Sequence, residues 1–143
     1  MKVAIVGSRN FTPMVLVAGF MYLLDRRIEI VSGGAPGVDR EAQQCAEAQG
    51  MKVAVFPAEW VKYRPANPNK KNPAGMIRNQ QIVDYSDVVV AFWDETSPGT
   101  RNTIERAKTA GKPVHILNGW QSEDTLRWTA FELNRQYQEE HHV

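Results

Sequence analysis

The sequence predicts an α/β fold, in which short buried strands alternate with amphipathic helices. Apolar runs of four or five residues, rich in β-branched side chains, recur along the chain, and helical patterns lie between them. Most connections are short, so we expect the strands to run parallel through right-handed crossovers, with helices on both faces of the sheet. The expected architecture is a Rossmann-like three-layer sandwich with a mostly parallel sheet of about five strands, and with its ligand site at their carboxyl ends.

The length and composition are those of one globular domain. The chain has 143 residues, of which 43% are hydrophobic, and we expect a single domain over residues 1–143. Its 17 Lys and Arg residues and 16 Asp and Glu residues leave a formal net charge of +1, which argues against nonspecific binding of nucleic acid by the whole molecule. A single cysteine, no signal-peptide pattern and no long apolar run predict a soluble, cytoplasmic protein without a membrane segment.

Five short strands are predicted. They are Val3–Val6, Ile28–Val31, Val53–Phe56, Val88–Phe92 and Val114–Leu117. The core of the domain is therefore expected over about residues 2–117.

Four helices are predicted between these strands. The first is expected over about 13–26, with Thr12 as its N-cap and Pro13 as its first residue. The next three are expected over about 37–49, 73–86 and 100–110, and Gly50 and Gly111 are placed to end two of them.

A last helix is expected from near Ser122 to about Gln138. One apolar stripe runs along it, and two further aromatic residues, Trp128 and Phe131, lie off that stripe, which consists of Leu126, Ala130, Leu133 and Tyr137. Two apolar faces on one helix predict that one face docks on the domain and the other self-associates, so we expect a homodimer.

One connection is long and basic. Residues 57–72 are rich in proline and polar side chains, which excludes a regular element, and loops of this length are often lids or binding loops. No acidic residue occurs between Trp60 and Val83, whereas this stretch holds Lys62, Arg64, Lys70, Lys71 and Arg78. A loop with this positive charge either covers an anionic ligand or is a solvated surface loop whose lysines keep the protein soluble, and the sequence leaves both possibilities open.

Three loops of small and polar residues follow strands that should be neighbours. They are Gly7-Ser8-Arg9-Asn10 after the first strand, Ser32–Asp39 after the second and Asp94–Thr100 after the fourth. The second loop passes through three glycines into a helix, an arrangement that aims backbone N–H groups and the positive end of the helix dipole at one point. Because the three loops should open on one edge of the sheet, the sequence predicts a phosphate site there.

In order and spacing these motifs resemble the SLOG superfamily of Rossmann-like nucleotide-binding domains. The resemblance is carried by Gly7-Ser8-Arg9, Gly33-Gly34-Ala35-x-Gly37-x-Asp39, Ile77-Arg78-Asn79-Gln80 and Gly99-Thr100-x-x-Thr103-Ile104, and it covers about residues 2–117. It is nearest to the small, YspA-like bacterial and phage branch. Relatives include the "lonely guy" phosphoribohydrolases, a single-stranded DNA-binding protein of transformation and sensors of NAD-derived signals. The resemblance implies a nucleotide or nucleotide-derived ligand in the cleft.

The loops and the resemblance together give a set of expected ligand-binding residues. They are Gly7, Ser8, Arg9, Ser32, Gly33, Gly34, Gly37, Asp39, Arg78, Asn79, Ser97, Gly99, Thr100 and Thr103. Arg78 is expected to face the cleft, Arg9 to bind a phosphate, and Thr100 to act both as N-cap and as phosphate ligand. Trp60 and Trp93 are placed either to stack on a base or to pack in the core. No metal-ligand spacing occurs, and no cofactor is expected.

An enzymatic alternative depends on a missing acid. The phosphoribohydrolases that the chain resembles carry P-G-G-x-G-T-x-x-E, in which the glutamate acts at the glycosidic bond, and here Thr103 stands in its place. If the chain is an enzyme, Asp39, Asp94, Glu95 or Glu105 has to supply the carboxylate, although the helical position of Glu105 favours a surface ion pair.

Three functions follow from these observations. The main prediction is a sensor or sequestering protein that binds a phosphate-bearing nucleotide, so that Gly34→Val should block the phosphate and leave the fold intact. The first alternative is a phosphoribohydrolase-type enzyme that cleaves the N-glycosidic bond of a nucleoside monophosphate. The second alternative is binding of single-stranded DNA, indicated by the basic loop and the tryptophans, with an affinity that falls steeply with salt.

Overall fold

The computed structural model of the chain describes residues 1–119 and 123–141. Its elements, in order, are β1 (Lys2–Gly7), α1 (Val15–Leu23), β2 (Glu29–Ser32), α2 (Val38–Ala48), β3 (Val53–Val55), α3 (Ala74–Tyr85), β4 (Val88–Phe92), α4 (Pro98–Thr109), β5 (Val114–Leu117) and α5 (Glu123–Glu140). Strands and helices alternate as predicted. The predicted start of the last helix near Ser122 lies outside the described residues.

The five strands form one sheet in the order β3-β2-β1-β4-β5, and every neighbouring pair is parallel. β1 lies at the centre, where Ala4 is in register with Val31 of β2 and Val89 of β4. These three side chains are fully buried, which explains why the central strands are apolar runs and do not alternate with polar residues. The predicted Rossmann-like α/β fold is confirmed.

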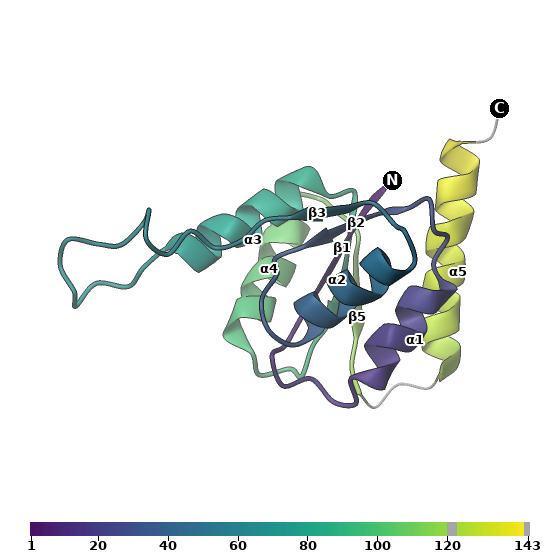
Figure 1. Cartoon of the computed structure of the whole chain (residues 1–143), viewed down its shortest axis with the longest axis horizontal. Coiled ribbons are helices and arrows are strands. Elements are labelled where there is room, and N and C mark those ends of the chain that lie inside the picture. Colours follow the sequence, from purple (N-terminus) through teal and green to yellow (C-terminus); the bar gives the residue numbers. More distant parts are fainter. Residues whose placement is uncertain (120–122, 142–143) are drawn as a thin grey trace.

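Helices cover both faces of the sheet, so the molecule has three layers (Figure 1). On one face, residues of α1, α2 and α5 form a core cluster with the sheet, in which Phe20 packs edge-to-face on Phe92 of β4. On the other face, Ile82 of α3 and Ile104 of α4 belong to a second cluster. Within the described ranges, no helix has both the length and the apolar character that crossing a membrane requires.

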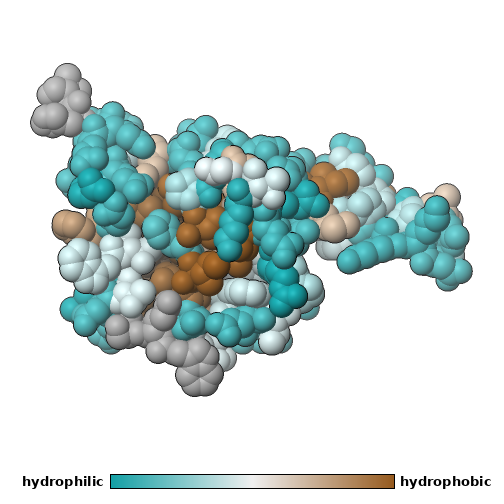
Figure 2. All heavy atoms as spheres, turned by 180° about the vertical axis from the view of Figure 1, so that it is seen from behind, coloured by the Kyte–Doolittle hydropathy of each residue, from teal (hydrophilic) through white to brown (hydrophobic). Residues whose placement is uncertain are grey.

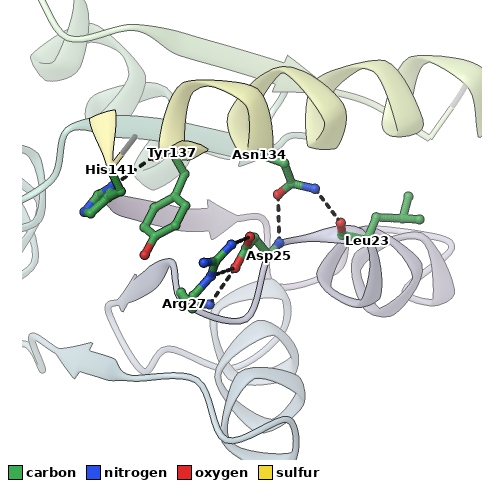
Figure 3. Close-up of polar contacts among 6 residues, drawn as sticks. All are labelled: Leu23, Asp25, Arg27, Asn134, Tyr137 and His141. Atoms are coloured by element: carbon green, nitrogen blue, oxygen red, sulfur yellow. Dashed lines mark hydrogen bonds and ion pairs between the residues drawn. The ribbon is translucent and has the colours of Figure 1, made fainter. Parts of the chain in front are cut away.

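The docking face of α5 is the predicted one. Its apolar stripe is buried in the first core cluster, through Leu126, Ala130, Leu133 and Tyr137. Asn134 attaches the helix to the end of α1: its Nδ2 donates to the Leu23 carbonyl oxygen at 2.9 Å, and its Oδ1 accepts from the Asp25 amide at 2.7 Å (Figure 3). One side chain thereby satisfies two backbone groups where α1 ends.

The start of α1 differs from the prediction. The helix begins at Val15 with Met14 as its N-cap, so Thr12 is not the cap and Pro13 is not the first helical residue. A Cβ atom on Gly119 would clash with the Thr12 carbonyl oxygen, so this backbone packs directly on the loop after β5. The contact between Thr12 and Gly119 therefore fixes the backbone that leads into α1.

The start of α4 also differs. Ser97 is the N-cap and Pro98 the first helical residue, so the prediction that Thr100 caps the helix is wrong. Proline is favoured at the first helical position because its missing N–H would have no intrahelical partner there. Thr100 instead lies in the first turn, where it is buried.

The long connection between β3 and α3 projects from the body (Figure 1). We call residues 61–71 the arm. Its base is closed by Asn72, whose side-chain Nδ2 donates to the Trp60 carbonyl oxygen at 2.9 Å and whose Oδ1 accepts from the Ala74 amide at 2.9 Å. The arm contains turns but no helix or strand, as predicted.

Candidate functional site

A cleft of about 640 Å³ opens beside the carboxyl end of β1. Its wall comes from the loops after β1 and β2, from both ends of the connection between β3 and α3, from the first turns of α3, and from the start of α4. β1 lies between β2 and β4, so the chain crosses from one half of the sheet to the other at this point. Ligands of open α/β sheets bind at such a switch of strand order.

Most of the predicted ligand-binding residues line this cleft. They are Gly7, Ser8, Arg9, Asp39, Arg78, Asn79, Ser97, Gly99, Thr100 and Thr103. Four predicted residues are not part of the wall: Ser32, Gly33, Gly34 and Gly37. Of the residues considered as catalytic acids, only Asp39 lines the cleft; Asp94 and Glu95 border a separate hollow, and Glu105 is exposed on α4. The structure describes no ion pair for Glu105, contrary to the expectation from its position.

The glycines of the second loop bring segments of the protein into close contact. A Cβ atom on Gly33 would lie 2.7 Å from Arg78 Nη1 and 2.8 Å from a carboxylate oxygen of Asp39, and one on Gly37 would meet the backbone of Arg9. Gly34 has a φ of +69° and faces Val55 of β3, at 3.2 Å from where its Cβ would be. Gly34 is therefore not part of the described cleft wall, and its positive φ and its contact with β3 explain why a glycine stands here. Its contact with a ligand stays a prediction.

Ser32 likewise shapes the loop from within. It is fully buried, its Oγ donates to the Asp39 carbonyl oxygen at 3.1 Å, and the same Oγ accepts from the Gly34 amide at 3.1 Å. Ser32 therefore fixes the path of the loop into α2 and does not reach the cleft.

Arg78 spans the distance from α3 to the second loop. Its Nη1 donates to the Gly33 carbonyl oxygen at 2.8 Å and its Nε donates to Asn79 Oδ1 at 3.1 Å. These two bonds hold the guanidinium against the cleft wall. Since guanidinium has five N–H donors, others stay available to an anionic ligand.

Asp39 is the only acidic residue among the described residues that line the cleft. Burial raises its pKa to about 6, although the positive charge of Arg78 and hydrogen bonds from the amides of Gly7, Ala35 and Gly33 oppose this shift. Its carboxylate is therefore ionised at neutral pH, and Arg78 compensates part of its charge.

The first turn of α4 presents backbone donors to the cleft. Ser97 makes no side-chain cap to the helix, so the amides of Gly99 and Thr100 have no intrahelical partner. Asp94 shapes the preceding loop by accepting from the amides of Ser97 at 2.7 Å and Thr96 at 2.9 Å. Although desolvation raises the pKa of Asp94, these hydrogen bonds outweigh it and hold the pKa well below its usual range.

Side-chain hydrogen bonds join α3 to α4 along the same wall. Asn102 Oδ1 accepts from Asn79 Nδ2 at 3.2 Å and from Arg106 Nε at 2.8 Å, and Arg106 Nη1 donates to Gln80 Oε1 at 2.9 Å. Because both bonds to Asn102 use its oxygen, its amide N–H₂ is available to a ligand.

Several wall residues were not predicted as site residues: Asn72, Gly75, Met76 and Asn102. Helical spacing gives a signal for two of them, since Gly75 precedes Arg78 by one turn and Asn102 follows Gly99 by one turn. Lys71 of the basic connection, for which the sequence left ligand binding open, also lines the cleft. Of the two tryptophans considered for stacking, Trp60 lines the cleft and is 54% exposed. Trp93 does not line it, and its Nε1 donates to the Ser97 carbonyl oxygen at 3.1 Å.

Positive charge dominates the cleft wall. The cationic side chains are Arg9, Lys71 and Arg78, and in the part of the chain that the structure describes neither Arg9 nor Lys71 has an ion pair or a side-chain hydrogen bond. No three His, Cys, Asp or Glu side chains among the described residues are close enough to hold a metal ion. The fold and the cleft therefore define the class of protein: a Rossmann-like α/β protein with an anion-favouring cleft at the switch point of a parallel sheet.

Comparison with known proteins gives the family. The family model for DNA recombination-mediator protein A matches residues 1–83, more than half of the chain, and the chain belongs to this family. The matched segment includes the four charged residues of the described cleft wall, Arg9, Asp39, Lys71 and Arg78. Membership supports the predicted place in the SLOG superfamily, whereas the YspA-like branch stays a prediction. No curated protein sequence matches the chain.

Solved structures of the same fold include two bacterial DNA processing proteins. DNA processing protein A (DprA) from Streptococcus pneumoniae is 25% identical, with a TM-score of 0.69 over 94% of this chain and 56% of its own. DprA from Helicobacter pylori, in a structure described as showing its single-stranded DNA binding mode, is 23% identical, with a TM-score of 0.69 over 99% of this chain and 82% of its own.

The structural genomics target TM1055 is also similar. It is 23% identical, with a TM-score of 0.61 over 79% of this chain and 71% of its own. At this identity the Helicobacter protein and TM1055 show likeness of fold alone. The chain spans 56% of the length of the pneumococcal protein.

Proposed function

We propose that the chain binds single-stranded DNA in the cleft, with the phosphates on Arg9, Lys71 and Arg78. The family and the DNA-binding relative from Helicobacter pylori favour this second alternative over the main prediction of a free-nucleotide sensor. The observation that supports it most is the presence of two cations, Arg9 and Lys71, that have no partner among the described residues, in a cleft whose described wall holds a single acid.

Other residues of the cleft wall are suited to further phosphates and to the bases of a DNA strand. The open amides of Gly99 and Thr100 are suited to a phosphate oxygen, since the N-terminus of a helix favours an anion. Trp60, half exposed at the rim, offers a surface on which a base can stack, a contact worth about 1–3 kcal/mol in single-strand binding proteins. Phosphate contacts and stacking both tolerate any base, so the binding should have little sequence preference.

The test is titration of the protein into a fluorescently labelled oligothymidylate, with anisotropy as readout. Arg9→Gln should weaken binding about tenfold by removing a charged phosphate contact. The matched control is Arg26→Gln, an exposed arginine after α1 that does not line the cleft. A protein that binds nucleoside monophosphates tightly but no oligonucleotide would contradict the proposal and restore the nucleotide-sensor prediction.

We also propose that the chain forms a homodimer through the exposed face of α5. Trp128 and Phe131 are 70% and 58% exposed, and their rings contact each other edge-to-face at 6.0 Å. They line a shallow hollow of about 330 Å³ together with Asp124 and Arg127. An acid and a base beside one apolar surface are self-complementary, because a two-fold axis places the acid of one copy near the base of the other.

A further inference from the structure

We infer that the arm, residues 61–71, is a second contact surface for single-stranded DNA, and that it binds phosphates of the strand after it leaves the cleft. The inference rests on the proposed function and extends it beyond the cleft. It is supported by the charge, exposure, shape and position of the arm, of which only Lys71 also belongs to the cleft wall.

The charge of the arm is unlike that of the rest of the surface. The arm has four cationic residues and no acidic one. Elsewhere on the described surface some exposed cations pair with acids, as Arg27 does with Asp25 at 2.7 Å and Lys52 with Glu29 at 3.2 Å. Others, such as Arg26 and Lys108, have no described ion pair, so the arm is distinguished by its lack of acidic residues. On the arm, the ion pair within the described ranges is that of Lys62 with Glu59 at its base, at 3.6 Å. The described structure gives the side chains of Arg64, Lys70 and Lys71 no partner.

The arm holds its shape without folding onto the body. Every arm residue except Tyr63 and Pro65 is exposed, and the arm end of the molecule is mostly hydrophilic in Figure 2. Turns are held by the Asn67 carbonyl oxygen, which accepts from the Lys70 amide at 3.0 Å, and by Asn67 Oδ1, which accepts from the Asn69 amide at 3.0 Å. Prolines and local turns restrict the backbone of the arm before any ligand binds, so binding costs less conformational entropy.

The arm is continuous with the cleft. Lys71, the last arm residue, is itself part of the cleft wall, and so are Asn72 and Trp60, which close the base of the arm. A strand that stacks on Trp60 and contacts Lys71 therefore meets Lys70 next. The arm has 11 residues, of which about half lead outward and half lead back. It therefore extends at most about 18 Å beyond its base, which is enough to follow a DNA strand past the cleft.

A surface of this composition fits a polyanion better than a protein. Protein interfaces gain from apolar and aromatic anchors, and lysine is depleted in them. Phosphates are bound by unpaired Lys and Arg through release of counterions, and the arm supplies these without competing acids.

The experiment compares two oligothymidylates, one of about six nucleotides that fills the cleft and one of about 20 that extends beyond it. The arm variant is Arg64→Gln with Lys70→Gln, which leaves the cleft residue Lys71 in place. The matched control is Arg26→Gln with Lys108→Gln, two exposed cations outside both the arm and the cleft wall. Both double variants remove two positive charges.

We expect the arm variant to weaken binding of the longer strand only. With about 0.7 counterions released per phosphate on a single strand, losing two contacts lowers the slope of log affinity against log salt by about 1.4. A fourfold rise in salt should then cost the wild type about sevenfold more affinity than the arm variant. The control should retain the wild-type slope and affinity on both strands.

Other outcomes would overturn the inference. Equal weakening on both strands would mean that the arm acts on the cleft, and no difference from the control would mean that it is a solvated loop. A change in oligomeric state without a change in DNA affinity would make the arm a protein contact. If the wild type binds neither strand, the proposed function itself fails. If the wild type binds both strands and the arm variant binds them as tightly as the wild type, the proposed function stands and this inference fails.

Discussion

At the scale of single residues, Asp39 makes the charge of the cleft depend on pH. Its pKa of about 6 means that the carboxyl is ionised near pH 7 and neutral near pH 5. The neutral form no longer repels a phosphate, so protonation and DNA binding favour each other. The affinity for an oligothymidylate should therefore rise by about tenfold as the pH falls from about 7 to about 5. Anisotropy titrations at constant ionic strength measure this.

The Asp39→Asn variant separates this carboxyl from other titrating groups. Its amide oxygen can still accept hydrogen bonds, but it carries no charge at either pH, so we expect a flat profile near the wild-type affinity at low pH. A variant that keeps the wild-type pH dependence would assign it to another group. His115 on β5 is one such group, since burial lowers its pKa while the charge of Glu132 opposes the shift.

Gly34 gives a second residue-scale prediction, on stability. Because its φ is +69° and Val55 lies close, Gly34→Ala should lower the free energy of unfolding by about 1–2 kcal/mol and leave DNA affinity unchanged. Urea denaturation and anisotropy measure the two effects. The control for stability is Gly99→Ala, since a Cβ there meets nothing within 4 Å and alanine favours the helix. If Gly34→Ala reduced affinity at unchanged stability, the phosphate cradle predicted from the sequence would be restored.

At the scale of elements, the hydrogen bonds of Asn102 hold α3 and α4 together. Asn102→Ala leaves donors of Asn79 and Arg106 without their acceptor in a half-buried wall. We expect the free energy of unfolding to fall by about 1–2 kcal/mol, and DNA affinity to fall with it because one of the side-chain bonds between α3 and α4 is lost beside the cleft. Lys108→Ala, on the exposed side of the same helix, should change stability by less than about 0.5 kcal/mol. Equal stability of the two variants would show that the bonds do not matter.

The strands could be predicted because strands that are buried on both faces consist of apolar residues, which the sequence shows directly. Val3 and Val90, for example, are fully buried in strands covered on both faces, so these segments are apolar without interruption. The start of α1 could not be found in this way, because Thr12 packs on Gly119, more than 100 residues away in the chain. The start of α4 could have been predicted from the sequence, because serine is favoured as an N-cap and proline as the first helical residue, and Ser97 and Pro98 hold these positions.

The cleft was predictable in outline from topology alone. Parallel strands place their following loops on one edge, which is why Ser8, Arg9 and Thr100 all line it. The sequence does not show which glycines allow close packing, whereas in the structure a Cβ atom on Gly33, Gly34 or Gly37 would meet a neighbouring segment. Nor does it show that Asn102 turns toward Asn79, since that contact depends on how two helices pack.

At the scale of the whole molecule, the net charge of +1 conceals two oppositely charged ends. The arm has four cationic residues and no acid, whereas α5 has five acids and two arginines. The arm and α5 lie at opposite ends of the molecule (Figure 1). A field of this kind orients an approaching polyanion toward the arm and cleft without making the protein bind nucleic acid over its whole surface.

The same arrangement gives the last prediction, on the dimer. If two copies meet through Trp128 and Phe131 of α5, the arms lie away from the contact and one long strand can occupy two clefts. The second cleft then binds at high effective concentration, so an oligothymidylate of about 40 nucleotides should bind about 100-fold more tightly than to a monomer. Trp128→Glu should give a monomer by sedimentation equilibrium and lose this gain, with unchanged affinity for the shortest strand. Val15→Glu, at an equally exposed apolar residue of α1, should remain dimeric. A wild type that sediments as a monomer would remove the premise, and a dimeric Trp128→Glu would place the contact elsewhere.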